Sequence, residues 1–294
     1  MENIKADLHA HGPIGFEPYW LRVQGYEGKN LLQLIVESCI KKDIRIAAIT
    51  SEAFEIPRGS IHDRLGYLAK MIKALPENYE AEMLGKESIV VKKGSKEVIL
   101  LSGQTPIIEE NGKRYDHLIV GSNRVPNGMN FSDTLQCCLD NGLPNFLEHP
   151  AVEEHCGTGL SLAEKLIMQH GDKITGIEGH NSNLVWPGFL SFAPKIGQYN
   201  RRANKMAKQL SEKIGKPYIA NSDAHRIEDI GTSYIEFEAG LIDRTNEEKL
   251  IQSITKAISS KKFSTKESYV PLTAWLKTSY LFINGLKDEK YKKG

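Results

Sequence analysis

The sequence has little cysteine, no long apolar run and almost no net charge. Its four cysteines among 294 residues include no Cys-x-x-Cys pair, which argues against a disulfide scaffold and against a zinc site built from paired thiolates. No segment approaches the ~18 consecutive apolar residues of a membrane span, and no basic stretch followed by an apolar run opens the chain. We therefore expect a soluble, cytoplasmic protein that has reduced thiols and no contact with a membrane.

The charge balance also limits the class of partner. Lys plus Arg number 38 and Asp plus Glu number 37, so the net charge is +1. Such a chain has no broad positive field for holding a nucleic-acid backbone, and nucleic acid is therefore disfavoured as a partner.

No linker, internal repeat or low-complexity stretch divides the chain. We expect one domain over 1–294, with a mobile tail from about residue 287.

Strand-like and helix-like patterns alternate along most of the chain. Short apolar strands are expected at 4–8, 45–50, 145–150, 174–178, 217–222 and 232–238. Helices are expected at 30–42, 60–75, 161–170, 201–214 and 246–259. Between 87 and 120 the pattern becomes β-rich with turn signals, which indicates an inserted β-hairpin. Repeated alternation favours an α/β fold with a parallel sheet, and seven or eight such strands permit closure into a TIM-like barrel.

The first predicted strand ends in the stretch DLHAH. Because side chains alternate in a strand, Asp7, His9 and His11 are expected to share one face. The same Asp-x-His spacing recurs at Asp223 and His225 after another predicted strand. A single pair of this kind is often a polar stripe on an edge strand. Two pairs at strand ends, which meet at the mouth of a barrel, instead favour a metal site.

Other predicted strands also end in imidazoles and acids. These residues are Glu52, His117, Glu148, His149, Glu178 and His180. Taken alone, His149 before Pro150 is better explained as a structural histidine, and His117 is also explained as a half-buried histidine hydrogen-bonded to a neighbouring strand. As a group, imidazoles and carboxylates without thiolate form a ligand set suited to zinc, manganese or iron. The sequence therefore predicts a catalytic divalent metal centre.

The motifs DLHAHG, LEHP, IEGHN and NSDAH, in this order and with this spacing, resemble those of the PHP family, the polymerase-and-histidinol-phosphatase domains. The resemblance runs from residue 7 to about 238. It implies a distorted β/α barrel of about seven strands, with up to three metal ions at its mouth, that hydrolyses phosphoesters. Carried over by position, the first metal would be held by His9, His11 and Asp223, the second by His117 and His149, and the third by His225.

Two positions depart from the family pattern. Ser51-Glu52 stands where the family usually has Asp-His, and Gly103-Gln104-Thr105 stands where it usually has Gly-x-Glu. That missing glutamate normally bridges two metals, and a threonine hydroxyl is a poor ligand beside a carboxylate. Glu52 would act as an oxygen ligand in place of the histidine, and Glu17 lies near where the family often supplies another acid. One or two metal ions is therefore the expected count, within a range of one to three.

The resemblance implies a metal-dependent phosphoesterase that acts on a small phosphorylated substrate. A bound cation would lower the pKa of a water to near neutrality, and the hydroxide would attack phosphorus in line. His149 or His225 would protonate the leaving oxygen if not itself a ligand. Arg226 or Arg58 would clamp the phosphate.

Three other functions compete with this one. A barrel of the same ancestry that has lost catalysis would bind a metal, a phosphorylated ligand or a protein partner, and Ser51 and Thr105 are the evidence for it. Against it, the clustered histidines and acids would be costly to bury without a cation. A proofreading nuclease fits the family but not the near-neutral charge. The same metal-activated water could also hydrolyse a bond other than a phosphoester.

Overall fold

A computed structural model describes residues 3–13, 15–16, 18–52, 63–110, 112–152, 157–185 and 201–291. Its strands are β1 (Asn3–Ala10), β2 (Ile44–Glu52), β3 (Tyr79–Met83), β4 (Ser88–Lys93), β5 (Lys96–Thr105), β6 (Ile107–Glu110), β7 (Lys113–Val120), β8 (Asn145–Leu147), β9 (Gly176–Asn181), β10 (Tyr218–Asn221), β11 (Tyr234–Glu238) and β12 (Ser264–Lys266). Its helices are α1 (Pro18–Gln24), α2 (Leu31–Lys42), α3 (Arg64–Ala69), α4 (Phe131–Asp140), α5 (Leu160–His170), α6 (Arg201–Ile214), α7 (Glu247–Ser259) and α8 (Leu272–Tyr291). The mixed α/β class predicted from the sequence is confirmed.

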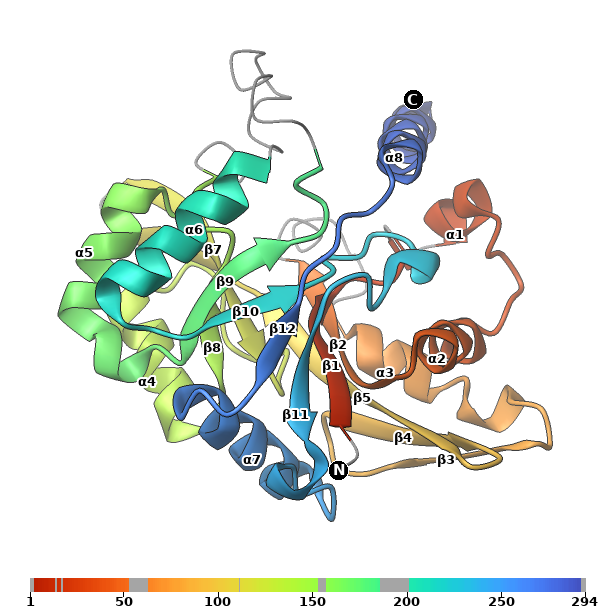
Figure 1. Ribbon diagram of the computed structural model, residues 1–294. Coiled ribbons are helices and arrows are strands. Elements are labelled where there is room, and N and C mark those ends of the chain that lie inside the picture. Colours follow the sequence, from red (N-terminus) through yellow and green to blue (C-terminus); the bar gives the residue numbers. More distant parts are fainter. Residues whose placement is uncertain are drawn as a thin grey trace.

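The strands form one barrel-like sheet with helices around it (Figure 1). The order along the sheet is β10-β9-β8-β7-β5-β2-β1-β11-β12, and the β3–β4 hairpin extends from β5. A parallel bridge between Ala10 and Ala224, with the amide of Asp223 donating to the carbonyl of His9 at 2.8 Å, brings the end of β1 against the chain that follows β10. The sheet therefore curls towards closure, as a distorted TIM-like barrel requires.

Strand direction differs in part from the expected parallel arrangement. β1–β2, β2–β5, β8–β9 and β9–β10 are parallel, whereas β5–β7, β7–β8 and β1–β11 are antiparallel. The reason lies in the β-rich stretch in which the sequence predicted an inserted hairpin. Connections this short cannot carry a helical crossover, so β5 and β7 run in opposite directions. They form part of the barrel wall. The expected turns of this stretch connect β4 to β5 and β6 to β7, whereas the β3–β4 hairpin begins before it, at Tyr79.

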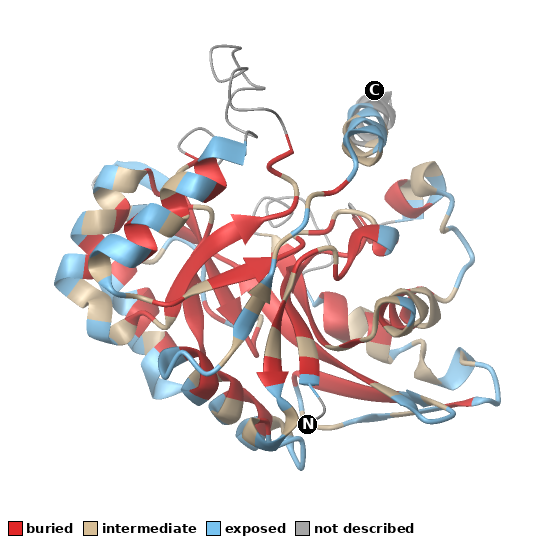
Figure 2. Cartoon of the chain, in the orientation of Figure 1, coloured by how far each residue is buried: buried red, intermediate tan, exposed pale blue. Residues whose placement is uncertain are grey.

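Helix α2 illustrates how local sequence sets the outer layer. The side chain of Asn30 accepts a hydrogen bond from the amide of Gln33 at the helix start, and Asp43 in the left-handed region closes its end. These are the residue types that satisfy free backbone groups at helix termini. The apolar face of α2 is buried against the sheet, while its other face is mostly of intermediate exposure (Figure 2). The helix therefore shields the outer side of β2 and β5.

One apolar cluster combines side chains from β1, β2, β5 and β7 with the buried face of α7. Its members include Leu8, Ile46 and Leu101, all inaccessible or nearly so. Helix α7 lies at the end of the sheet where β1 begins (Figure 1). The polar side chains are at the opposite ends of these strands, so the fold separates an apolar base from a polar mouth.

The structure can be compared with two further expectations, one about a mobile tail and one about membrane-spanning segments. The expected mobile tail overlaps α8, which extends to Tyr291. Within the described residues, no helix combines the length and apolar character needed to cross a membrane.

Candidate metal centre

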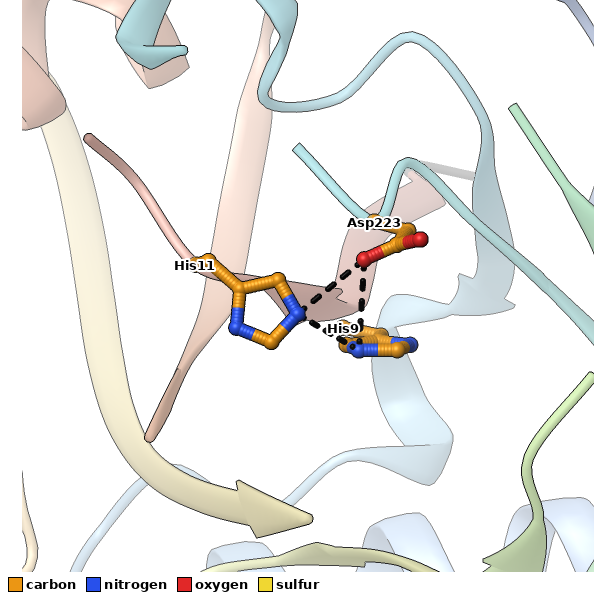
Figure 3. Close-up of side chains that lie close together, drawn as sticks. All are labelled: His9, His11 and Asp223. Carbon is orange, nitrogen blue, oxygen red and sulfur yellow. Dashed lines mark hydrogen bonds and ion pairs between the residues drawn. The ribbon is translucent and has the colours of Figure 1, made fainter. Parts of the chain in front are cut away.

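Three side chains from the two Asp-x-His stretches converge on one point (Figure 3). The Nε2 atom of His11 lies 3.0 Å from Nε2 of His9 and 3.0 Å from Oδ1 of Asp223, and His9 Nε2 lies 3.5 Å from the same oxygen. Ligands at about 2.1 Å from a tetrahedral zinc ion are about 3.4 Å apart. The three atoms are therefore spaced as ligands of a single cation would be, and the residues fit the metal that the resemblance implies.

Outer partners determine which nitrogen of each imidazole faces this point. Nδ1 of His9 lies 2.8 Å from Oε1 of Glu178, and Nδ1 of His11 lies 3.0 Å from the carbonyl oxygen of Thr50. Carboxylate and carbonyl oxygens only accept, so both Nδ1 atoms carry hydrogen. Each Nε2 is then the atom available to a cation, which is the arrangement that second-sphere partners of metal-bound histidines usually create.

Asp223 is fixed in a similar way. Its Oδ2 accepts a hydrogen bond from Asn181 at 2.9 Å, so its Oδ1 faces the two imidazoles. Burial alone would raise the Asp223 pKa, but the imidazoles of His9, His225 and His11 hold it well below its usual range. Its φ of +48° lies in a region that non-glycine residues rarely adopt. Such strain is often found at functional sites.

The surroundings of His9 and His11 determine whether each imidazole is protonated in the metal-free centre. Burial opposes protonation of His9, but Glu178, Asp223 and Glu148 raise its pKa well above that of a free imidazole. Burial lowers the pKa of His11, which is therefore neutral. The proton of His9 points at the lone pairs of His11 and Asp223, so it takes the position that a cation would take.

Glu52 and His225 lie beside this centre. The Nε2 atom of His225 is 2.9 Å from Oε1 of Glu52, and its Nδ1 donates to the carbonyl oxygen of Asp223 at 2.9 Å. Burial works against the charged imidazole, but Asp223 and Glu52 raise the His225 pKa to about 9. His11, Glu52 and His225 form a second group whose ligand atoms lie close enough to hold a cation.

A third set of polar groups borders His9 on another side. Oε1 of Glu148 lies 3.1 Å from Nε2 of His149 and 3.7 Å from Nε2 of His9. Burial opposes its charged form, but Glu148 and its neighbours raise the His149 pKa to about 9. His149 also has a positive φ, +21°. The strand-end residues Glu148 and His149 are therefore part of the same polar mouth.

His117 does not join these groups, and the expectation that it shares a metal with His149 needs correction. Its Nε2 hydrogen-bonds Oδ1 of Asn145 at 3.1 Å, and its ring packs 5.2 Å from the ring of Phe131 in α4. Burial lowers its pKa to about 4. Because side chains alternate along β7, the neighbouring Asp116 faces the mouth instead. Burial and Glu148 raise the Asp116 pKa well above its usual range.

Asp7 also differs from its expected position. Its carboxylate accepts hydrogen bonds from the amides of Ser222 and Gly231 rather than facing the centre. The pairing of β1 with β2 shifts register between Asp7 and Ala10. Such an irregularity changes the direction of the following side chains, so simple alternation fails there.

Several other expected residues lie apart from the centre or outside the described residues. Arg226 pairs with Glu228 and Asp229 at 3.4 and 3.9 Å. His180 hydrogen-bonds the carbonyl oxygen of Ser268. Thr105 is buried beside Glu52 in the β2–β5 register. Glu17 and Arg58 fall outside the residues that the structure describes. The sequence analysis missed Asn181 and the orienting role of Glu178.

Comparisons with known proteins were made on the sequence and on the fold. A family model described as PHP-associated matches residues 201–257, and no curated protein matches the chain. The fold is similar to PsfC from Pseudomonas syringae, with 10% identity, a TM-score of 0.53 and 99% of each chain covered. It is similar to the lesion-specific endonuclease PfuEndoQ from Pyrococcus furiosus, with 13% identity and a TM-score of 0.50.

That second similarity covers 88% of this chain and 56% of the endonuclease, so the chain spans about half of that protein. A two-domain protein from Bacteroides vulgatus containing a predicted PHP-like metal-dependent phosphoesterase aligns with 12% identity and a TM-score of 0.49, covering 91% and 65% of the two chains. The PHP-associated match includes Asp223 and His225, two of the residues that carry the motif resemblance. The barrel brings these two residues beside His9 and His11, and together with the match this supports a relationship to the PHP domain family.

Proposed function

We propose that this protein is a metal-dependent phosphoesterase that hydrolyses a small phosphorylated substrate. The observation that supports it is the group of three buried ligand atoms on His9, His11 and Asp223, mutually 3.0 to 3.5 Å apart. Buried imidazoles and carboxylates at such distances are costly unless a shared ion or proton satisfies them. The near-neutral net charge favours a small substrate over a nucleic acid.

The chain's own residues would have distinct tasks. His9, His11 and Asp223 would hold a zinc, manganese or iron ion, and Glu178 and Asn181 would keep the ligand atoms in place. A divalent cation bound there supplies a water of lowered pKa and neutralises phosphate oxygens. We expect one to three cations, and the position between His9, His11 and Asp223 is the best supported of the three.

Proton delivery to the leaving oxygen is assigned to His225 or His149. Each has a pKa of about 9 in the metal-free protein, so each carries a proton at neutral pH. His225 is the better placed of the two for this role, because its Nδ1 is committed to a carbonyl oxygen and its side chain is 28% exposed. A partly exposed imidazolium can reach a substrate oxygen, as a general acid must.

The test combines metal analysis with an activity assay. We expect purified protein to contain zinc, manganese or iron and to hydrolyse p-nitrophenyl phosphate, with activity lost on chelation and restored by added metal. His11→Ala should lose both metal and activity, whereas His170→Ala, on the outer helix α5, should keep both. Absence of bound metal under all conditions would contradict the proposal. Bound metal without chelator-sensitive turnover would support the cation-binding barrel instead.

A further inference from the structure

Arg64 is the first residue of α3, and its side chain is inaccessible to solvent. An arginine is rarely buried to this extent, because its guanidinium is always charged and a buried charge is costly unless polar groups surround it. Helix α3 packs against β2, the strand that ends at Glu52. The buried charge is therefore close to the mouth of the barrel, and its contacts indicate its role there.

One contact of Arg64 is with the backbone of a candidate metal ligand. Its Nη1 donates a hydrogen bond to the carbonyl oxygen of His11 at 2.5 Å, and hydrogen bonds from a charged donor are about twice as strong as neutral ones. The amide of His11 donates to the carbonyl oxygen of Ala224 at 2.8 Å, and its Nδ1 donates to that of Thr50 at 3.0 Å. Every polar atom of His11 apart from Nε2 is therefore held by a neighbour, and Nε2 is the atom that faces the cation position.

A second contact of Arg64 is with the ring of Phe16. The guanidinium carbon lies 5.1 Å from the ring centroid, and Phe16 is itself 1% exposed. Cations within about 6 Å of an aromatic centroid are attracted to its face, most strongly where water is excluded. Since His11 and Phe16 both belong to the segment that follows β1, one side chain fastens this segment at two points.

The charge of Arg64 also acts on Glu52, the acid at the end of β2. Burial alone would raise the Glu52 pKa, but the two neighbouring imidazoles and the guanidinium lower it. The ionised carboxylate lies 2.9 Å from Nε2 of His225. Arg64 thus offsets part of the negative charge that this carboxylate adds to the mouth, without occupying a ligand position itself.

We propose that Arg64 is a positioning residue of the candidate metal centre. Its guanidinium clamps the segment after β1, so that the imidazole of His11 faces the first cation, the one between His9, His11 and Asp223. Its charge stabilises the ionised Glu52 beside that cation. A neutral side chain of equal length would fill the space but would hold neither the carbonyl oxygen nor the charge. This inference rests on the cation position of the proposed function and not on the reaction catalysed there.

Mn²⁺ binding by the metal-free full chain, measured by competition with a fluorescent chelator, tests the proposal. We expect Arg64→Met, which keeps an unbranched side chain, to lower the affinity for the first cation by about 10–100-fold, the usual effect of losing an outer-sphere partner. Arg64→Lys should lose less affinity, because it keeps the charge and a donor but not the planar fork.

Leu68→Ala, at a fully buried position of the same helix, is the matched control. Leu68 packs in the apolar cluster around α2, and its truncation opens a cavity without removing a polar contact. The variant should therefore have a lower melting temperature than the wild type but an unchanged affinity for Mn²⁺. A purely structural role of Arg64 would instead give the two variants the same pattern.

Failure of this inference and failure of the proposed function are distinguishable. Equal Mn²⁺ affinities for Arg64→Met and the wild type would overturn the inference, and so would an equal loss of affinity in Leu68→Ala. If Arg64→Met does not fold, Phe16→Leu keeps the proposal testable, since removal of the ring should also weaken Mn²⁺ binding. A wild-type protein that binds Mn²⁺ without hydrolysing p-nitrophenyl phosphate would contradict the proposed function and leave this inference intact. A wild-type protein that binds no divalent cation would overturn both.

Discussion

Oε1 of Glu178 lies 2.8 Å from Nδ1 of His9, and both side chains are fully buried although the residues are 169 positions apart in the sequence. The carboxylate fixes the tautomer of the imidazole, because an N–H at Nδ1 leaves the lone pair at Nε2. It also fixes the ring orientation, so that Nε2 faces His11 and Asp223. Glu178 therefore controls the candidate metal centre without taking one of the three ligand positions itself.

Removal of this carboxylate should weaken cation binding. We expect Glu178→Ala to lower the affinity for the first cation by about 10–100-fold, the usual effect of losing an outer-sphere partner. Glu178→Gln, which keeps an acceptor for the Nδ1 hydrogen but not the charge, should have a smaller effect. Competition with a fluorescent chelator measures both affinities. Glu80→Ala, at an exposed position of β3, is the control. Equal affinities for Glu178→Ala and Glu80→Ala would contradict this role.

Asn181 places an uncharged amide between two carboxylates, with Nδ2 at 2.9 Å from Oδ2 of Asp223 and 3.3 Å from Oε2 of Glu178. Asn181→Asp would add a third negative charge, and uncompensated buried charges cost about 3–5 kcal/mol. We therefore expect a lower melting temperature for the metal-free variant and a partial recovery with saturating cation, because ligands stabilise the state that binds them. Thermal unfolding with and without Mn²⁺ measures this.

The exposed Asn141→Asp serves as the control for the Asn181 variant, since Asn141 lies at the surface end of α4. Its melting temperature should change by little in either condition. If Asn181→Asp were as stable as Asn141→Asp without metal, the amide would not be separating the two negative charges.

Much of the architecture was predictable because periodicity and strand ends are local properties of the sequence. The apolar run before His9 identified β1, and the repeated Asp-x-His spacing identified the two chain segments that meet at the centre. The convergence of distant strand ends follows from the barrel itself. These features need no knowledge of individual contacts, which is why the sequence predicted that His9, His11 and Asp223 lie together.

The incorrect predictions concern the direction in which side chains point. In a strand, a shift of one residue reverses that direction. In the stretch YDHLIV both Asp116 and His117 are competent ligands, and the sequence analysis chose the histidine. Leu118 and Val120 belong to the cluster between the sheet and α7, so Asp116 shares their face by alternation. That signal was present in the sequence. The register shift that turns Asp7 away from His9 was not, because it depends on how β1 pairs with β2.

The hydrogen-bond partners of the candidate ligands could not be predicted from the sequence either. Asn181 contacts Asp223 across 42 positions, and Glu178 contacts His9 across 169. An asparagine or a glutamate at a strand end has many possible partners, and its sequence neighbours do not select among them. Contacts of this kind follow from the three-dimensional arrangement alone.

The pH dependence of cation binding follows from the protonated histidines. A cation must displace the proton of His9, whose pKa is raised well above that of a free imidazole by Glu178 and its neighbouring carboxylates despite burial. Metal ligands must be deprotonated, so binding should release protons and the affinity should rise as the pH increases from 6 to 9. Calorimetric titration in two buffers of different ionisation enthalpy counts the protons. A buffer-independent enthalpy would show that none is released.

The stability of the metal-free protein should depend on pH in the opposite direction. The pKa of His149 and of His225 is about 9 when folded, against 6.5 for an ordinary imidazole. A raised folded-state pKa gives stabilisation that is complete below 6.5 and is lost as the pH rises through 9. We expect the melting temperature of the metal-free protein to fall between pH 6.5 and 9. His149→Gln should reduce that fall, and an unchanged slope would contradict the assignment.

Asp7 connects β1 to the backbone beside Asp223 through the amides of Ser222 and Gly231, which donate at 3.1 and 2.7 Å. Asp7→Ala would leave both buried amides without an acceptor, and each such loss costs about 1–3 kcal/mol. We expect urea unfolding of the metal-free variant to give a free energy about 2–4 kcal/mol lower than wild type. The exposed Asp140→Ala should change it by less than ~0.5 kcal/mol. Because Ser222 precedes Asp223, Asp7→Ala should also weaken cation binding, and a destabilised variant with unchanged affinity would show that the two effects are independent.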